Sequence, residues 1–232
     1  MRDGKITKMD EVKDPIYLDP NAETDAAERL KGRQVKYERL VPKLYVGASF
    51  DNFEATDKAS QSLRELGQKF AKIVIDCIVN KVGNPKNLIF YGPPGTGKTH
   101  LACAIMRHVH FSTTANPSVI RITGQDIRYL DSNMSVNVEQ VIKDIKTLKQ
   151  VPLLVIDDIT KQNLPSTKEL LFDVISTRCE NALPTIAITN LSDKAFKHLD
   201  ERIYSRLVGN GFLIRFTGDD HRLSAKKHLR LG

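Results

Sequence analysis

The residues with the clearest chemistry form the run Gly92-Pro93-Pro94-Gly95-Thr96-Gly97-Lys98-Thr99, which follows a short apolar segment, Leu88-Ile89-Phe90-Tyr91. A strand, a glycine-rich loop and a helix in this order place backbone N–H groups around a phosphate, because glycine has no Cβ to obstruct them and the helix N-terminus adds unpaired donors. We expect Lys98 to reach the β- and γ-phosphates and the Thr99 hydroxyl to bind Mg²⁺. The sequence therefore predicts a site for ATP and Mg²⁺, lined from Gly92 to His100.

A second run, Leu153-Leu154-Val155-Ile156, reads as a buried strand that ends in two carboxylates, Asp157 and Asp158. Burying carboxylates has an electrostatic cost that a bound Mg²⁺ offsets. We assign Asp157 to the metal, through water, and Asp158 to orienting or deprotonating the attacking water. The structural alternative is that both acids merely cap the next helix.

The elements that must position these residues follow from the hydrophobic pattern. Short apolar runs alternate with longer amphipathic ones from Asn87 onward, which predicts an α/β fold, a five-stranded parallel sheet between helices. We expect strands at residues 88–91, 119–122, 153–156, 185–188 and 212–216. Apolar residues at three-and-four spacing predict one helix from about Thr56 to Val79, and the phosphate loop opens another from Lys98 to His110.

Residues 1–45 differ from the rest in being highly charged and poor in branched apolar side chains. The helix start at Asp19-Pro20-Asn21 and the stop at Pro42 predict one helix, from Ala22 to Leu40. We therefore divide the chain into a short N-terminal helical arm, 1–45, and an ATPase domain, 46–232. A disordered solubilising tail is the alternative for the arm.

Composition limits the classes of protein to which the chain can belong. With 232 residues and 41% hydrophobic content, the chain can bury one α/β core, and neither a membrane span nor a signal-peptide core is present. We expect a cytoplasmic protein. The three scattered cysteines predict buried free thiols, not disulfides or a zinc site. The net charge of +7 favours a polyanionic partner.

Several motifs in order resemble the AAA+ helicase loaders of the DnaC type, to which the transposition helper IstB is related. The phosphate loop continues as His100-Leu101-Ala102, and Asp157-Asp158 follows at the expected place. Ser49-Phe50-Asp51-Asn52-Phe53 resembles the segment that enters the ATPase domain of these loaders. The resemblance covers residues 45–230 and implies an AAA+ P-loop NTPase with strand order 5-1-4-3-2 and a small or absent helical lid.

The resemblance also implies three further catalytic residues. Asn190, at the sensor 1 position, can hydrogen-bond the γ-phosphate and the attacking water, although a helix cap is its structural alternative. Arg206, the second arginine of the pair with Arg202, resembles the finger that reaches a neighbouring subunit's γ-phosphate. Arg222, at the sensor 2 position, would act within its own subunit. Surface roles are the alternatives for these arginines.

One departure from the pattern concerns hydrolysis. Many AAA+ proteins have Glu where this chain has Asp158, and the missing methylene shortens the reach by about 1.5 Å. A misplacement of about 1 Å can slow a step by roughly two orders of magnitude. Two hypotheses therefore stay open: a working DNA-stimulated ATPase, with slow turnover, and an ATP-gated binding and assembly module.

The function implied by the resemblance is ATP-dependent loading of a replicative, DnaB-type hexameric helicase onto single-stranded DNA, by a protein that self-associates into an open oligomer and has no membrane partner. Asp126–Gln150 is long enough for an extra helix of the kind that tracks single-stranded DNA in this family. It offers a possible phosphate contact, a stacking face and a row of lysines at Arg128, Tyr129, Lys143, Lys146 and Lys149, for which a solvated face is the alternative. The alternative function is an IstB-like transposition regulator acting on DNA with a transposase; the charged arm and the Ser49–Phe53 entry favour the loader.

Overall fold

The computed structural model describes residues 22–116, 118–160, 167–198, 200–218 and 220–221, with side chains from Glu28 onward. The chain divides into two units between Lys36 and Tyr37, ahead of the boundary expected at residue 45. Helix α1 (Ala22–Leu40), which has the bounds expected from the sequence, spans this division. In the first unit, Leu30 and Val35 are 61% and 48% exposed.

The end of α1 belongs to the core of the second unit. Tyr37 is fully buried, and its hydroxyl donates a hydrogen bond of 2.9 Å to the carbonyl oxygen of Cys103. Burial raises the pKa of the Tyr37 hydroxyl far above its usual value. Val41 is also buried. These two residues, which the sequence analysis assigned to the arm, are therefore part of the second unit's core.

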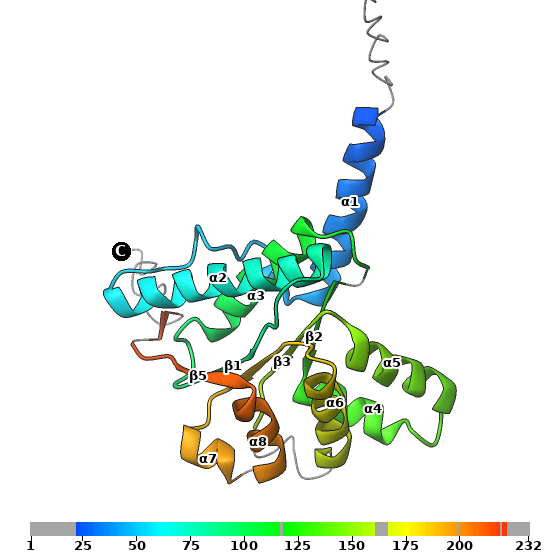
Figure 1. The fold of residues 1–232 in the computed structure, drawn as a ribbon, viewed down its shortest axis with the longest axis vertical. Coiled ribbons are helices and arrows are strands. Elements are labelled where there is room, and N and C mark those ends of the chain that lie inside the picture. The colour runs from blue at the N-terminus through cyan, green and yellow to red at the C-terminus, as the bar shows by residue number, and fades with distance from the viewer. Residues whose placement is uncertain (1–21, 117, 161–166, 199, 219, 222–232) are drawn as a thin grey trace, which may run out of the picture. The chain divides into compact units, whose positions relative to one another are not determined.

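A parallel five-stranded sheet forms the centre of the second unit (Figure 1). Its strands lie in the order β2-β3-β4-β1-β5, the order that the resemblance implied. Their bounds are β1 (Asn87–Tyr91), β2 (Val119–Thr123), β3 (Leu153–Asp157), β4 (Thr185–Thr189) and β5 (Gly211–Arg215). Every residue of β3 and β4 is buried, as expected for central strands covered on both faces.

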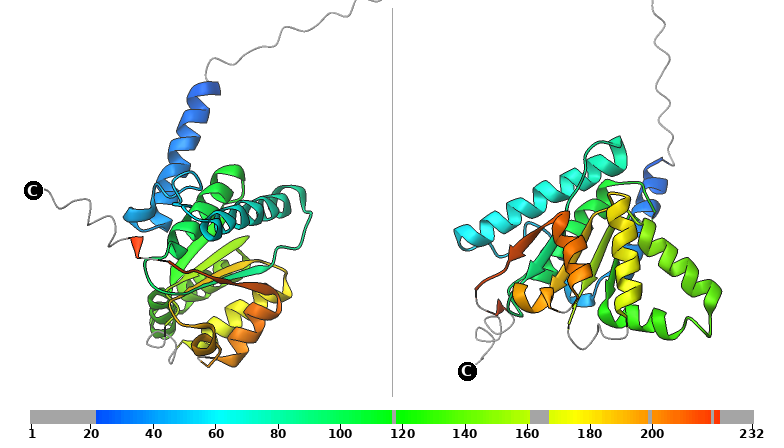
Figure 2. Two further views of the ribbon diagram at one scale, coloured as in Figure 1. Left: turned by 90° about the vertical axis from the view of Figure 1, so that its left-hand side faces the viewer. Right: turned by 60° about the horizontal axis from the view of Figure 1, so that its bottom comes forward.

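Helices cover both faces of this sheet (Figures 1 and 2). Side chains alternate along each strand, so Leu88 and Phe90 face one helical layer while Ile89 faces the other. The first layer contains α2 (Lys58–Asn80) and α3 (Lys98–Ser112). The second contains α4 (Gly124–Ser132), α5 (Val138–Gln150), α6 (Lys168–Glu180), α7 (Asp193–Lys197) and α8 (Glu201–Gly209). The fold class predicted from the sequence is confirmed.

Local chemistry explains where the helices begin. Asp57 caps α2, because its carboxylate accepts from the Ser60 backbone N–H at 2.7 Å, and the helix therefore starts two residues later than expected.

Helices α4 and α5 fill the long connection between β2 and β3, so the insertion expected there is present as two helices. After Arg215 the description extends only to His221, and the question of a helical lid lies outside the described residues.

Cys77, Cys103 and Cys179 are free thiols, as expected, but of the three only Cys103 is buried, and the other two are partly exposed. Burial raises the pKa of Cys103 to about 12. No helix in the described part of the chain combines the length and the apolar character needed to cross a membrane.

A fully buried arginine holds the amino ends of β3 and β4. The Arg178 guanidinium donates to the carbonyl oxygens of Leu148 and Val151 at 2.8 Å and of Pro184 at 2.6 Å, and its Nε donates to the Thr185 hydroxyl at 3.0 Å. Burial lowers its pKa to about 9, so the side chain still carries its charge at neutral pH. These bonds fix the starts of the two strands whose other ends carry Asp157 and Asn190.

Replacing Arg178 by Met should destabilise the domain by about 3 kcal/mol, because the substitution leaves buried carbonyl oxygens without donors. The free energy of unfolding in urea, followed by circular dichroism, measures the effect. Arg39→Met is the matched control, since Arg39 is exposed and its loss should cost at most about 0.5 kcal/mol. Equal stabilities for the two variants would contradict a structural role for Arg178.

Candidate active site

The phosphate loop lies between β1 and α3, and close backbone packing shapes it. Gly92 has φ +133°, and a Cβ at this position would lie 2.2 Å from the carbonyl oxygen of Phe216. Gly95 has φ +76°, and its Cβ would overlap the Asp220 carboxylate. Both positions therefore require glycine for the loop to pack against the segment that follows β5. The Phe216 N–H reinforces this packing by donating to the carbonyl oxygen of Tyr91 at 2.8 Å.

Lys98 supplies a buried positive charge at this loop. Its Nζ donates to the carbonyl oxygen of Gly92 at 2.8 Å and to that of Pro93. The Thr96 hydroxyl also donates to the Pro93 carbonyl oxygen, at 2.9 Å. The ammonium group is thus held at the base of the loop, where a phosphate bound to the loop's N–H groups would meet it.

A cavity of about 630 Å³ opens beside the loop. It has the size and the mixed polarity of a small-ligand site. The predicted site residues that line it are Pro94, Gly95, Gly97, Lys98, Thr99, His100, Asp157, Asp158 and Asn190. The predicted residues Gly92, Pro93 and Thr96 are outside the lining. They take part in hydrogen bonds within the loop that hold its conformation.

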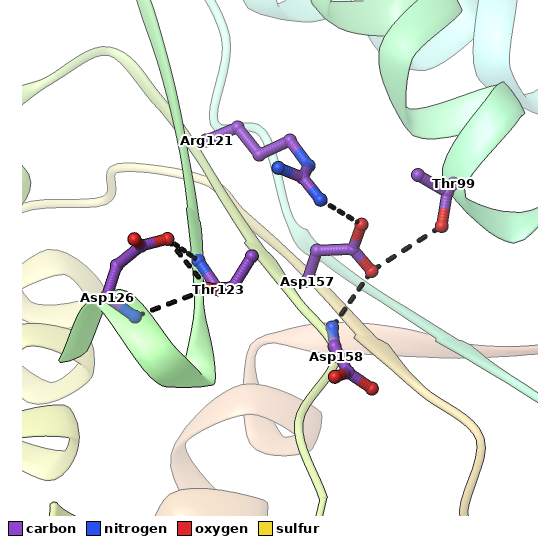
Figure 3. A network of polar contacts seen from close by, with 6 residues as sticks. All are labelled: Thr99, Arg121, Thr123, Asp126, Asp157 and Asp158. Carbon is purple, nitrogen blue, oxygen red and sulfur yellow. Dashed lines mark hydrogen bonds and ion pairs between the residues drawn. The ribbon is translucent and has the colours of Figure 1, made fainter. Parts of the chain in front are cut away.

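Asp157 is the most constrained carboxylate of the cavity (Figure 3). One of its oxygens accepts from the Asp158 backbone N–H at 2.9 Å and from the Thr99 hydroxyl at 3.5 Å. The other accepts from Arg121 Nη2 at 2.7 Å. The structure therefore brings together the two predicted Mg²⁺ ligands, Thr99 and Asp157, and adds an arginine that the sequence analysis did not single out.

These residues fit Mg²⁺ carried in with a nucleotide. A hydroxyl and a carboxylate are the hard oxygen ligands that Mg²⁺ prefers, and the ion usually completes its shell with phosphate oxygens and water. Among the described residues, no cluster of three or more His, Cys, Asp or Glu side chains forms a metal site by itself. The Lys98 ammonium and the backbone N–H groups of the loop would supply the complementary phosphate site.

Asp158 follows Asp157 in the chain and has an unusual backbone conformation. Its φ of +58° places a non-glycine residue in the left-handed region, and its exposed side chain lines the cavity. Such a conformation costs roughly 1 kcal/mol or more and is typical of functional sites. The next helix in the described part of the chain, α6, has Thr167 at its N-cap position, so the two acids do not cap this helix.

Asn190 lies just past the carboxyl end of β4 and lines the same cavity. The preceding Thr189 hydroxyl donates to the carbonyl oxygen of Ile159 at 2.7 Å, which ties the end of β4 to the segment after Asp158. Helix α7 is capped by Ser192, whose hydroxyl accepts from the Ala195 N–H at 3.2 Å. The helix-cap alternative for Asn190 is therefore wrong, and its catalytic role stays a prediction.

The two arginines of α8 differ in their surroundings. Arg202 bonds both carboxylate oxygens of Glu169, at 2.8 and 3.2 Å, and lies 3.2 Å from the Asp200 carboxylate. The Arg206 side chain is exposed, lies outside the cavity and has no hydrogen-bond or ion-pair partner in the described part of the chain. Arg202 is thus held within its own subunit, while Arg206 is available to another molecule.

His100 and the entry segment close one side of the cavity. His100 Nε2 lies 3.0 Å from Asn52 Oδ1, and burial lowers the pKa of the ring, which favours its neutral form. The Phe53 ring packs edge-on against His100. In the same cavity lining, His221 Nδ1 lies 2.8 Å from a carboxylate oxygen of Glu54, and the His221 backbone N–H donates to the Gly95 carbonyl oxygen. Arg222, the next residue and the predicted sensor 2 residue, lies outside the described residues.

The comparison with known families agrees with this site. Residues 88–208 match the family described as "ATPase family associated with various cellular activities (AAA)", and the chain belongs to it. This stretch contains the phosphate loop, the Asp157-Asp158 pair and Asn190. The family supports nucleotide use and ATPase activity for the domain in general.

Similar proteins include replicative helicase loaders. The chain is 29% identical to the replicative helicase loader DnaC of Escherichia coli K12 over 213 residues, which are 85% of this chain and 80% of the relative. It is 27% identical to DnaC of Buchnera aphidicola (strain APS), over 80% of this chain and 74% of the relative. A solved DnaC helicase loader matches with a TM-score of 0.60 at 23% identity, over 76% of this chain and 100% of that one, and shows the same fold. The resemblance to the loaders is confirmed.

Replacing Lys98 by Ala should abolish measurable binding of ATP with Mg²⁺, because it removes the buried cation at the phosphate loop. Isothermal titration calorimetry with ATP and Mg²⁺ provides the measurement, and Lys69→Ala, an exposed lysine on α2, is the matched control. An unchanged ATP affinity in a folded Lys98→Ala protein would exclude the phosphate loop as the nucleotide site.

Proposed function

We propose that this chain uses ATP to load a replicative DNA helicase onto single-stranded DNA. The observation that carries the proposal is a cavity lined by Lys98, Thr99, the carboxylates and Asn190, while Arg206, the arginine expected to complete the site, is exposed outside it. Such a site suits a protein whose ATP use depends on assembly. Similarity to replicative helicase loaders along 85% of the chain supports the same role.

Within one subunit, each residue has a distinct task. Lys98 would hold the β- and γ-phosphates, and Thr99 and Asp157 would hold Mg²⁺, which supplies positive charge to neutralise the phosphates. Asp158 and Asn190 line the cavity where they can orient a water molecule toward the terminal phosphate. The side chain of Asp158 is one methylene shorter than glutamate, and we therefore expect slow hydrolysis that DNA or assembly stimulates.

DNA contact is assigned to the helices inserted between β2 and β3. Tyr129 on α4 is 68% exposed and can stack on a base, while Lys143 and Lys146 on α5 are exposed and can contact phosphates. Lys149 forms an ion pair of 2.6 Å with Asp173 on α6 and is the weakest candidate of the lysine row. Arg128 is half-buried.

Helicase docking is assigned to the N-terminal helical arm, residues 1–45. Leu30 and Val35 are exposed apolar residues on α1, within a segment that carries few others, and they suit a helix-in-groove contact of modest area. The proposed partner is a DnaB-type hexameric helicase in the cytoplasm, engaged by an open oligomer of this chain with ATP bound. No membrane partner is proposed.

Arg206→Ala should leave ATP affinity within about twofold of the natural protein and remove the stimulation of ATPase activity by single-stranded DNA, since the arginine acts on a neighbour's site. Steady-state phosphate release, with and without single-stranded DNA, measures this effect. Arg202→Ala is the comparison variant. Because it removes the ion pairs with Glu169 and Asp200, it should lower the free energy of unfolding of the protein.

Mixing Arg206→Ala with Lys98→Ala tests whether the site is shared between subunits. One variant retains the phosphate loop and the other retains the arginine, so some interfaces in a mixed assembly contain both. Partial recovery of turnover is expected. No recovery from folded, co-assembling variants would argue against an intersubunit site.

Deleting residues 1–36 should preserve ATP affinity and abolish co-elution with the cognate helicase. The cut leaves Tyr37 and Val41 in place, and the core of the second unit therefore stays intact. Calorimetry and size-exclusion chromatography measure the two properties. A full-length Leu30→Ala/Val35→Ala variant, expected to weaken co-elution, checks that the apolar side chains carry the contact. Full helicase affinity in the deletion variant would place the docking surface on the ATPase domain.

A further inference from the structure

Arg121 is a charged residue on β2, on the same face of the sheet as Asp157. It lies on β2 between the buried residues Val119 and Ile122. Side chains alternate along a strand, so Arg121 shares the face of Val119, which packs in the layer of α2 and α3. The parallel pairing of β2 with β3 places Arg121 opposite Val155, two residues before the pair of Thr123 and Asp157. The fold thus directs an arginine toward the phosphate loop.

Among the described residues, the Arg121 guanidinium has one carboxylate partner and some N–H donors without a partner. Its side chain is 14% exposed and donates one hydrogen bond of 2.7 Å, from Nη2 to Asp157. Its Nε is buried and has no hydrogen-bond partner among the described residues. A guanidinium carries five N–H donors, and a largely buried one that uses so few is poorly compensated by its single carboxylate.

The position of this group relative to the nucleotide residues is specific. Figure 3 shows Arg121 and Thr99 approaching different oxygens of the Asp157 carboxylate from different elements. Arg121 also lines the cavity together with Lys98 and Thr99. A triphosphate in the loop brings several negative oxygens into this cavity, and guanidinium groups bind phosphate oxygens through two donors at once.

We propose that Arg121 is a nucleotide-binding residue that holds the terminal phosphates of ATP directly, in addition to pairing with Asp157. The inference rests on the ATP site proposed above and adds a second cation from the same subunit to Lys98. Because Arg121 shares with Mg²⁺ the task of neutralising the phosphates, the chain should retain measurable ATP binding without metal. Binding of ADP, which has one phosphate fewer, should depend less on Arg121.

The rival interpretation is that Arg121 serves Asp157 alone and only balances its buried charge. Removing the arginine would then still disturb ATP binding, because an unpaired Asp157 would repel the phosphates. The two interpretations separate when Asp157 is made neutral. In an Asp157→Asn background, an arginine that only balances Asp157 no longer contributes to ATP binding, whereas an arginine that binds phosphate still does.

The test is ATP binding without metal, measured by calorimetry in EDTA for the natural protein, Arg121→Met, Asp157→Asn and the double variant. We expect Arg121→Met to weaken metal-free ATP binding about tenfold or more in both backgrounds, and ADP binding less. Equal metal-free affinities of Asp157→Asn and the double variant would overturn the inference, as would a natural protein that binds ATP only with Mg²⁺. Absence of ATP binding by the natural protein even with Mg²⁺ would contradict the nucleotide site itself, and the inference with it.

Two further variants test whether a general loss of positive charge, or a loss of folding, explains the weaker ATP binding. Lys72→Met removes one positive charge from the exposed side of α2, outside the cavity, and should leave metal-free ATP binding unchanged. If Arg121→Met does not fold, as judged by circular dichroism, Arg121→Gln removes the charge while keeping a polar side chain. The same loss of metal-free ATP affinity is expected for Arg121→Gln, and natural affinity in that variant would overturn the inference.

Discussion

The charge of Asp157, buried at the carboxyl end of β3, is the constraint around which the nucleotide site is arranged. Its oxygens meet the Thr99 hydroxyl from α3, the Arg121 guanidinium from β2 and the Asp158 N–H from its own chain. A buried carboxylate is costly unless it is bonded in this way. The adjacency of β2 and β3 in the sheet, and the position of the phosphate loop after β1, therefore bring the partners of this one carboxylate together.

The same sheet accounts for the division of tasks in the molecule. Its carboxyl edge collects the catalytic candidates Asp157, Asp158 and Asn190, while Arg178 fixes the amino ends of β3 and β4 through buried carbonyl groups. The site thus has a rigid frame within one subunit. The exposed Arg206 on α8 and the inserted helices α4 and α5 lie outside this frame, as the proposed contacts with a neighbouring subunit and with DNA require.

Sequence patterns predicted the parts of this structure that depend on neighbours in the chain. The phosphate loop, the Asp157-Asp158 run and the bounds of α1 are local features, and their hydrophobic or turn signals are strong. The ion pair of Arg202 with Glu169 joins residues 33 positions apart, so helix spacing could not reveal it. The sequence placed Arg121 correctly on a strand but gave it no role. The shared face of Val119 and Arg121, combined with the implied adjacency of the second and third strands, was the available signal. The burial of Tyr37 depends on α3 and was likewise beyond a composition argument.

The proposed function requires that ATP binding by this chain place a ring-shaped helicase around single-stranded DNA. Loading onto a closed circle of single-stranded DNA tests this claim most directly, because a circle has no end over which a closed ring can thread. Helicase retained on the circle after gel filtration is the quantity measured, with the natural protein and ATP, with the Lys98→Ala protein, and without either. Retention only with the natural protein and ATP is the predicted result, and equal retention in all three samples would contradict the proposed function.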